Sequence, residues 1–410
     1  MRLALHPAMA AEGGFIPGFY RWSQPLPLMP GVMVHREAFR ADWLPQNTQE
    51  AFRILYTATD GISGAGQLPV SGYVLIPRGP RPANGWPVVI WAHGTTGVAD
   101  MCAPSVRGID RRDNVYLDAW LGRGFMVVAT DYQGLGTPGP HPYLLYRPEA
   151  YSLLDAARAV LADKGLHARN EMVLVGQSQG AGAGLAAAWM HPRYAPDLAV
   201  KAAVLTGLVA TVHRDDANAT GTKEQRYTSI DEMDAGFVML RLAGSDQAIH
   251  PTVDLEALLN DRGKAMLNVA RHGCLHDLFG AEHTLGFSTG AAMFGERRAA
   301  LRAFDRDFNI FFELPNGHVT MPVFVGTGLA DGMAGTAGQY DAVSALCRAG
   351  STIQWHTYPG VTHGGAVNYS FADSLPFVRN ILAGRPVQSS CQTLEPPGPV
   401  QSPRTDVPFN

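Results

Sequence analysis

The chain has 410 residues, of which 46% are apolar, 17% are charged and 9% are aromatic, with 32 basic against 36 acidic side chains. This composition is typical of a folded globular protein, and the near-balance of charge excludes a whole-chain field that would attract nucleic acid or an anionic membrane. No uninterrupted run of about 18 apolar residues is present, so the sequence predicts no transmembrane helix. The length suits two or three domains, or one large α/β domain with insertions.

The first 50 residues are irregular in pattern and rich in proline, with aromatic side chains such as Phe19 and Trp22. We therefore expect residues 1–50 to wrap around a larger body rather than to form its core. The opening ten residues contain an apolar stretch that Pro7 interrupts. This stretch is too short for a complete export signal, so it does not by itself assign a compartment.

From residue 51 onward, apolar runs rich in β-branched residues predict eight strands. They cover residues 52–59, 70–77, 87–93, 125–131, 171–177, 201–207, 321–328 and 351–359. Helical patterns alternate with them from the third strand onward, at residues 112–122, 148–164, 180–191, 297–307, 338–348 and 366–382. Buried strands separated by helices are typical of a mostly parallel α/β sheet with helices on both faces.

The alternation stops between the sixth and seventh predicted strands, where about 110 residues show helical spacing and no strong strand pattern. An insertion between parallel strands should lie above their carboxyl ends, where open α/β sheets bind ligands. We therefore expect a catalytic domain of residues 51–211 and 318–384, interrupted by a helical cap or lid at 212–317. A helical domain unrelated to the site is the alternative.

The tail at residues 385–410 holds six prolines and no helical period, so it would fray without a tether. Of the four cysteines, Cys391 lies in this tail. A disulfide to Cys347 would hold the tail and leave Cys102 to pair with Cys274, whereas four free thiols are the alternative. Two disulfides would indicate an oxidising compartment, and hence a secreted or periplasmic protein.

A local cluster of His272, Cys274 and His276 has the residue types of a metal site. A structural zinc site needs a fourth ligand, which nothing nearby supplies, and the chain contains no CxxC pair. We therefore predict no metal site.

The segment Gly176-Gln177-Ser178-Gln179-Gly180 follows a predicted strand and precedes a helix rich in small residues. In a Gly-x-Ser-x-Gly motif the serine occupies a sharp turn, and the flanking glycines let strand and helix approach closely. We predict Ser178 to be a nucleophile. The N–H of Gln179 at the helix N-terminus would donate to a developing oxyanion.

A serine hydroxyl needs a base, and the base needs an orienting carboxylate. Asp331 follows the predicted strand 321–328, and His363 follows the strand 351–359, so both lie at the same edge of the sheet as Ser178. The chain order Ser, Asp, His is that of α/β-hydrolases. We predict His363 to be the base and Asp331 to orient it.

A second oxyanion donor is expected from the loop after an early strand. The segment from His93 to Gly97 follows the predicted strand 87–93 and places the N–H of Thr95, and its hydroxyl, at the same edge. We predict Thr95 as this donor, with a simple Gly-rich turn as the alternative.

Together these motifs resemble the secretory lipase family of the lipase A type, within the α/β-hydrolases. The resemblance rests on GQSQG, HGTTG, DYQGLG, the Ser, Asp, His order and the helical insertion, and it extends over roughly residues 50–390. It implies an α/β-hydrolase fold with a helical cap over a tunnel for acyl chains, and disulfides that join the first cysteine to the second and the third to the fourth. Some members carry an acidic residue where this chain has Thr95 and Thr96.

The resemblance implies the same roles for Ser178, Asp331, His363 and Gln179. We expect hydrolysis of a small-molecule or lipid ester through an acyl-enzyme, with no metal or organic cofactor and no nucleic acid partner.

A lipid interface would suit such a substrate, although a charged stretch at residues 213–234 argues against a purely apolar entrance. Acyl transfer to an alcohol would use the same residues. An intact triad argues against a third alternative, a binding protein without catalysis.

Overall fold

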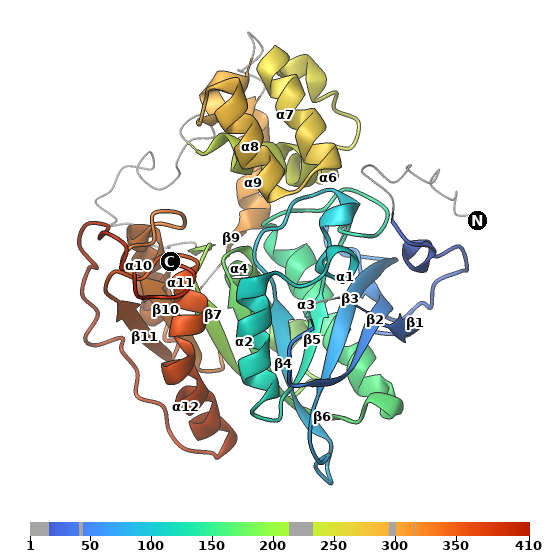
Figure 1. Ribbon diagram of the computed structural model, residues 1–410, viewed down its shortest axis with the longest axis vertical. Coiled ribbons are helices and arrows are strands. Elements are labelled where there is room, and N and C mark those ends of the chain that lie inside the picture. The colour runs from blue at the N-terminus through green and yellow to red at the C-terminus, as the bar shows by residue number, and fades with distance from the viewer. Residues whose placement is uncertain (1–15, 41–43, 213–232, 295–300, 316) are drawn as a thin grey trace.

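A nine-stranded, mostly parallel sheet runs through the molecule, with helices on both sides of it (Figure 1). The computed structural model describes residues 16–40, 44–212, 233–294, 301–315 and 317–410. The strand order is β1-β2-β3-β5-β4-β6-β7-β10-β11, with antiparallel pairing from β1 to β5 and parallel pairing from β5 to β11. The strands are β1 (Met33–Ala38), β2 (Thr48–Thr59), β3 (Gln67–Pro77), β4 (Trp86–Ala92), β5 (Met126–Thr130), β6 (Ala168–Gln177), β7 (Val200–Thr206), β10 (Val323–Gly328) and β11 (Ile353–Tyr358).

The eight predicted strands all form, but the prediction of an irregular segment over residues 1–50 is wrong for β1 and for the start of β2. β1 is an edge strand that pairs only with β2 in the sheet, and its last four residues are exposed. It contains two neighbouring charged residues, Arg36 and Glu37, and no apolar run. Charged side chains on an edge strand oppose pairing with other chains. Because of them β1 lacks the buried apolar run by which the other strands were predicted.

Successive residues of the central strands point to opposite faces, and each face has its own helices. Val88 and Ile90 of β4 pack in the core beneath α3, α4 and α10, whereas Val89 and Trp91 pack beneath α2, α11 and α12. The helices are α2 (Arg111–Leu121), α3 (Tyr146–Ala162), α4 (Gln179–Tyr194), α10 (Thr336–Arg348), α11 (Gly365–Tyr369) and α12 (Phe371–Leu382). Shorter elements are η1 (Gly18–Tyr20), η2 (Asp100–Cys102), α1 (Pro104–Arg107) and η3 (Lys164–Leu166).

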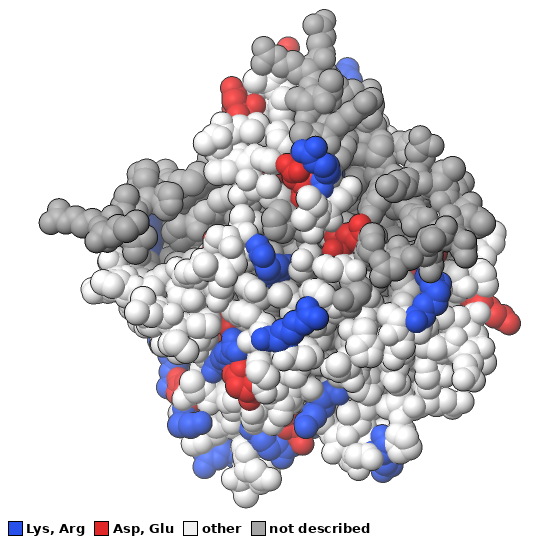
Figure 2. Space-filling model, turned by 180° about the vertical axis from the view of Figure 1, so that it is seen from behind, with Lys and Arg blue, Asp and Glu red and all other residues white. Residues whose placement is uncertain are grey.

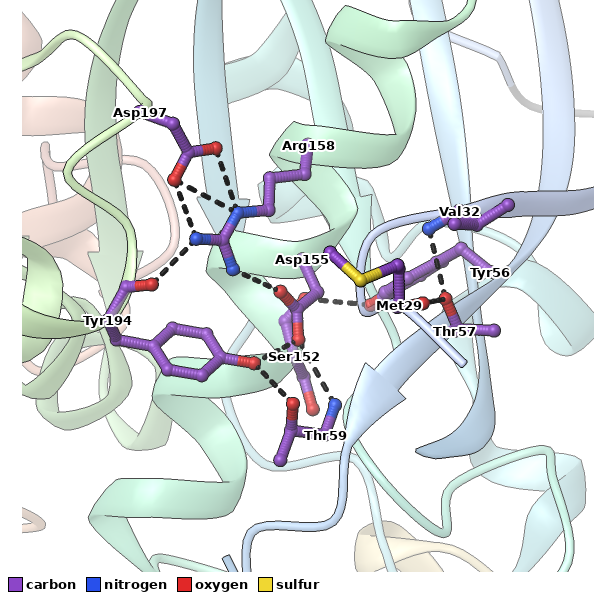
Figure 3. Close-up of polar contacts among 10 residues, drawn as sticks. All are labelled: Met29, Val32, Tyr56, Thr57, Thr59, Ser152, Asp155, Arg158, Tyr194 and Asp197. Carbon is purple, nitrogen blue, oxygen red and sulfur yellow. Dashed lines mark hydrogen bonds and ion pairs between the residues drawn. The ribbon is translucent and has the colours of Figure 1, made fainter. Parts of the chain in front are cut away.

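A buried carboxyl group joins α3, α4 and β2 (Figure 3). Oδ2 of Asp155 on α3 accepts hydrogen bonds from the Tyr194 hydroxyl at 2.6 Å and from the Thr59 N–H at 3.2 Å. Arg158 donates to the other oxygen at 3.0 Å and also pairs with Asp197. Burial raises the pKa of Asp155 to about 6, although the hydrogen bonds oppose this shift. The network holds α4, which follows Ser178, against its neighbours.

The described residues between β7 and β10 are mainly helical, and they form a second apolar cluster together with Tyr143 of the segment before α3. The two ends of the insertion meet, since β8 (Thr211–Val212) pairs in parallel with β9 (Glu313–Leu314). Between them lie α5 (Ala235–Leu240), the π-helical turn η5 (Arg241–Asp246), α6 (Gln247–Ile249), η6 (Glu256–Leu258), α7 (Asp261–His272), α8 (Leu275–Leu285), η7 (Gly290–Met293) and α9 (Leu301–Phe312). In Figure 1, α7, α8 and α9 lie at one end of the sheet. Most of the charged stretch at 213–234 lies outside the described residues.

Both expected disulfides are present. Cys102 is bonded to Cys274, with 5.5 Å between their Cα atoms, and Cys347 is bonded to Cys391, with 5.3 Å between theirs. The first bond ties the helical insertion to the loop after β4, and the second ties the proline-rich tail to the end of α10. The sulfur of Cys274 is therefore engaged and is not available as a metal ligand beside His272.

The surface carries charges of both signs. Figure 2 shows Lys and Arg side chains interspersed with Asp and Glu and separated by wide uncharged areas on the face opposite to that of Figure 1. Within the described part of the chain, no helix combines the length and the apolar character needed to cross a bilayer.

Candidate active site

Ser178 occupies a sharp turn between a strand and a helix. β6 ends at Gln177 and α4 begins at Gln179, and Ser178 between them has φ 58° and ψ −122°. This left-handed region is unfavourable for a residue with a side chain and costs about 1–3 kcal/mol. The surrounding structure holds it, since the N–H of Ser178 donates to the carbonyl of Thr206 at 2.9 Å.

The two glycines of the motif allow this turn because no side chain would fit at either position. A Cβ on Gly180 would lie 1.9 Å from the carbonyl oxygen of Ala92, and one on Gly176 would lie 2.1 Å from that of Gly180. Such distances are far inside van der Waals contact, so β4, β6 and α4 approach one another only with glycine there.

Asp331 and His363 are brought together by the loops that follow β10 and β11. Nδ1 of His363 lies 2.8 Å from Oδ2 of Asp331, and both side chains are buried. The other oxygen of Asp331 accepts hydrogen bonds from the N–H groups of Met333 and Ala334 at 3.0 and 2.9 Å. Burial opposes ionisation of Asp331, yet the bonds from His363 and the two N–H groups hold its pKa below the usual range.

His363 Nε2 is buried and has no hydrogen-bond partner among the described residues. The ring packs against Gly207, where a Cβ would lie 2.7 Å from its Cε1 and Nδ1 atoms. Gly207 directly follows Thr206, whose carbonyl binds the N–H of Ser178, so the backbone after β7 lies beside both residues. A bond between Ser178 Oγ and His363 is not formed here, and catalytic hydrogen bonds often tighten only when substrate is bound.

A glutamine on α10 completes the surroundings of Asp331. Nε2 of the buried Gln339 donates to Asp331 Oδ2 at 2.8 Å, and its Oε1 accepts from the Thr327 hydroxyl at 2.9 Å and from the Leu208 N–H at 3.2 Å. Gln339 therefore links the strands beneath the aspartate to the aspartate itself. The sequence gives no sign of this role, because a single glutamine within a helix has no local signature.

The two predicted oxyanion donors have different surroundings. Gln179 is the first residue of α4, and its buried side chain turns away from solvent toward Glu149 and His141. Thr95 is half-buried in the loop after β4, where its hydroxyl lies 2.9 Å from the hydroxyl of Tyr143. Either hydroxyl can donate in this contact, and the N–H of Thr95 stays the predicted oxyanion donor.

Glu149 and His141 are buried behind Gln179, and both favour their neutral forms. Burial raises the pKa of Glu149 to about 8 and lowers that of His141 to about 4. Nδ1 of His141 lies 2.9 Å from the carbonyl of Gln133, so the neutral ring donates there and accepts at Nε2 from the amide of Gln179. Sequence patterns gave no indication of either residue.

The helical insertion contacts the loops on this edge of the sheet. The N–H of Leu275, at the start of α8, donates to the carbonyl of Thr96 at 2.9 Å, next to Thr95. The hydroxyl of Ser245 donates to the carbonyl of Tyr143. Together with the Cys102–Cys274 bond, these contacts fix the insertion to the two segments that carry Thr95 and Tyr143.

Comparison with known proteins agrees with this architecture. The model of the secretory lipase family matches residues 109–389. Secreted triacylglycerol lipase LIP7 of Malassezia globosa is 26% identical over 289 residues, which is 68% of this chain and 58% of that protein. Lipase A of Arthroderma benhamiae is 34% identical over 99 residues, 23% of this chain and 20% of its own length. The matches thus span less than two thirds of these relatives.

Solved structures show the same fold at low sequence identity. Candida antarctica lipase A in its closed state superposes with a TM-score of 0.68 at 19% identity, covering 92% of this chain and 87% of that one. The rice cell wall degrading esterase LipA from Xanthomonas oryzae superposes with a TM-score of 0.62 at 18% identity, covering 87% of this chain and 97% of its own. Because the family model spans more than half of the sequence, this chain belongs to the secretory lipase family and has the α/β-hydrolase fold.

Proposed function

We propose that the protein is a serine carboxylic ester hydrolase that acts through an acyl-enzyme on Ser178. The observation that carries the proposal is the buried pair of His363 and Asp331 beside a strained serine turn. Membership of the secretory lipase family supports the same class of reaction.

In the proposed reaction, Ser178 Oγ attacks the ester carbonyl while His363 Nε2 accepts its proton. Asp331 keeps the ring oriented with Nδ1 protonated and stabilises the imidazolium that forms. The N–H groups of Gln179 and Thr95 would donate to the oxyanion. His363 returns the proton to the leaving alcohol, and water then resolves the acyl-enzyme by the same steps in reverse. None of these steps calls for a metal or an organic cofactor.

We further propose that residues 212–317 act as the cap of this site and contribute to acyl binding. The support is their attachment to the loops of Thr95 and Tyr143. Small-molecule or lipid esters are the proposed substrates. The two disulfides and the family suit an oxidising compartment, so we propose a secreted or periplasmic location.

A panel of esters of increasing acyl length, assayed with the wild type and with Ser178→Ala, tests the proposal. The variant should lose at least about 10⁴-fold in kcat, since removal of the nucleophile leaves only binding and the oxyanion donors. An organophosphonate should label the peptide that contains Ser178. Retention of activity in Ser178→Ala, or labelling of a different residue, would contradict the mechanism. Turnover of short acyl groups alone would limit the activity to an esterase.

Addition of an alcohol to the same assay separates hydrolysis from acyl transfer. Both reactions share the acyl-enzyme, so Ser178→Ala should abolish both. A predominance of the transesterified product at low alcohol concentration would assign the protein as an acyltransferase instead.

A further inference from the structure

The last ten residues of the chain, 401–410, lie against the loops that carry Asp331 and His363. In Figure 1 the C-terminus lies beside α11, the helix that follows the His363 loop. The segment has no regular secondary structure, and it is tethered upstream through the Cys391–Cys347 bond. It is held by side-chain and backbone hydrogen bonds to particular loop residues and by one buried apolar side chain, Val407.

Asn410 uses all of its side-chain polar atoms on this contact. Its Oδ1 accepts from the N–H of Thr362 at 2.8 Å and from the Thr362 hydroxyl at 3.1 Å. Its Nδ2 donates to the carbonyls of Gly360 and Arg404, each at 2.8 Å. Asn410 thus binds both the residue that directly precedes His363 and the glycine at the start of the same loop.

Gln401 connects the His363 loop to the Asp331 loop. Its N–H donates to the carbonyl of Leu329, two residues before Asp331, at 2.8 Å. Its side-chain Oε1 accepts from the N–H of Gly360 at 2.9 Å. The carbonyl of the same glycine accepts from the N–H of Arg404 at 2.8 Å. Gln401 therefore bridges the two loops, which are also joined directly where the N–H groups of Leu329 and Ala330 donate to the carbonyls of Tyr358 and Val361, each at 2.9 Å.

The fit between the segment and the loop is close. A Cβ on Gly365 would lie 2.1 Å from Oδ1 of Asn410, so only glycine leaves room for this contact. Val407 is buried with Tyr358, Val361 and Ala366 in a small apolar cluster beneath the loop. The segment thus satisfies backbone polar groups of the loop and also packs against its inner side.

We propose that residues 401–410 are a positioning segment for the general base, with Asn410 and Gln401 holding the His363 loop in register with the Asp331 loop. This inference rests on the proposed function. The ring of His363 is held by the bond to Asp331 and by contact with Gly207, so its position depends on where its loop lies. A displacement of about 1 Å in a catalytic group can cost about 10²-fold in rate.

Four variants of this 410-residue chain test the proposal: Asn410→Ala, Gln401→Ala, Gln401→Glu and Ser402→Ala. We expect Asn410→Ala to lower kcat by about 10- to 100-fold with little change in KM. Gln401→Ala should lower kcat less, because it removes one side-chain bond and keeps the backbone bond to Leu329. Gln401→Glu should restore most of this loss, since a carboxylate oxygen accepts the same bond from Gly360. Ser402→Ala, at an exposed neighbouring position, should match the wild type.

The outcomes separate this inference from the proposed function. Wild-type kcat in Asn410→Ala and Gln401→Ala, together with normal phosphonate labelling of Ser178, would overturn the positioning role and leave the ester hydrolase proposal intact. The positioning role would also be overturned if kcat fell only together with the thermal midpoint and Gln401→Glu did not restore it. Asn410 and Gln401 would then have a purely structural role. Absence of esterase activity and of Ser178 labelling in the wild type would overturn both proposals.

Discussion

The side-chain amide of Gln179 donates a 2.7 Å hydrogen bond to Oε1 of Glu149, a carboxyl group buried on α3. The same Oε1 accepts from the N–H of Leu144 at 2.9 Å. Gln179 also carries the N–H that we propose as an oxyanion donor. The protonation state of Glu149 therefore sets the charge directly behind the proposed oxyanion site.

Glu149→Gln should remove a pH dependence of stability. Burial raises the pKa of Glu149 from 4.5 to about 8, so the folded protein binds this proton more tightly than the unfolded chain. Its contribution to stability is fully present below about pH 4.5 and is lost as the pH rises through about 8. The amide of the variant cannot ionise. The difference between the thermal midpoint of the variant and that of the wild type should therefore shift in favour of the variant as the pH rises from about 5 to about 9.

The same substitution should change the pH dependence of kcat. Above about pH 8 the wild type would place a carboxylate near a developing oxyanion, so its kcat should fall several-fold more than that of the variant. Burial lowers the pKa of the neighbouring His141 to about 4 and raises the pKa values of Tyr132 and Tyr143, so these three groups do not ionise in this range. Identical alkaline profiles of the two proteins would show that Glu149 does not influence the reaction.

Gly207→Ala should impair the proposed base directly. Gly207 has φ +57°, and a Cβ there would lie 2.7 Å from the ring of His363. The left-handed backbone costs about 1–2 kcal/mol with alanine, and the ring must move to relieve the contact. We expect kcat to fall by about 10- to 100-fold, measured on a short-chain ester.

Gly332→Ala is the matched control for that substitution, because Gly332 adjoins Asp331 and a Cβ there would meet no heavy atom within 4 Å. Its kcat should stay close to that of the wild type. Equal losses in the two variants would mean that the effect comes from loop glycines in general and not from contact with His363.

The hydrogen bond between Tyr143 and Thr95 should hold the loop of the proposed oxyanion donor in place and so contribute to kcat/KM. A double-mutant cycle with Tyr143→Phe, Thr95→Val and the double variant isolates the pair, with kcat/KM as the measured quantity. Each single variant should lower kcat/KM several-fold, and the double variant should lose little more, which corresponds to a coupling of about 1 kcal/mol. Fully additive losses would show that the two hydroxyl groups act independently.

The strands of the sheet, and the positions of the proposed site residues at their ends, could be predicted because they have local patterns, whereas the catalytic roles stay a proposal. β4 and the middle of β6 are apolar runs, and Ser178 lies in a motif whose glycines are required by the close approach of β6 to α4. Asp331 and His363 follow strands at one edge of a parallel sheet, so their proximity follows from the topology. These features need only a short window of sequence and the rules of sheet packing.

The features that the sequence did not predict depend on contacts between distant segments. β1 is recognisable only through its pairing with β2. Gln339 and Glu149 are single polar residues within helices, and their roles follow from partners such as Asp331 and Gln179 in other elements. The contacts of Asn410 join residues that lie 48 and 50 positions apart. Periodicity and motif spacing contain no information on such pairs.

The two disulfides should contribute unequally to stability. Cys102 and Cys274 are 172 residues apart, and Cys347 and Cys391 are 44 apart. In the chain-entropy model, loops of these lengths correspond to upper values of about 5 and about 4 kcal/mol. Paired Cys→Ser variants, unfolded in urea, should therefore both lose stability, with the larger loss for the Cys102–Cys274 pair.

Activity at a temperature well below the unfolding transition separates local effects of the two bonds from global ones. Loss of the Cys102–Cys274 bond loosens the start of α8, because the hydrogen bond from Leu275 to Thr96 then holds it to the loop that carries Thr95 without the covalent link. Loss of the Cys347–Cys391 bond frees the tail that contacts the His363 loop. We expect the first variant to alter KM for long acyl esters and the second to lower kcat on all esters. The reverse pattern would contradict the placement of acyl binding in the insertion and of base positioning in the tail.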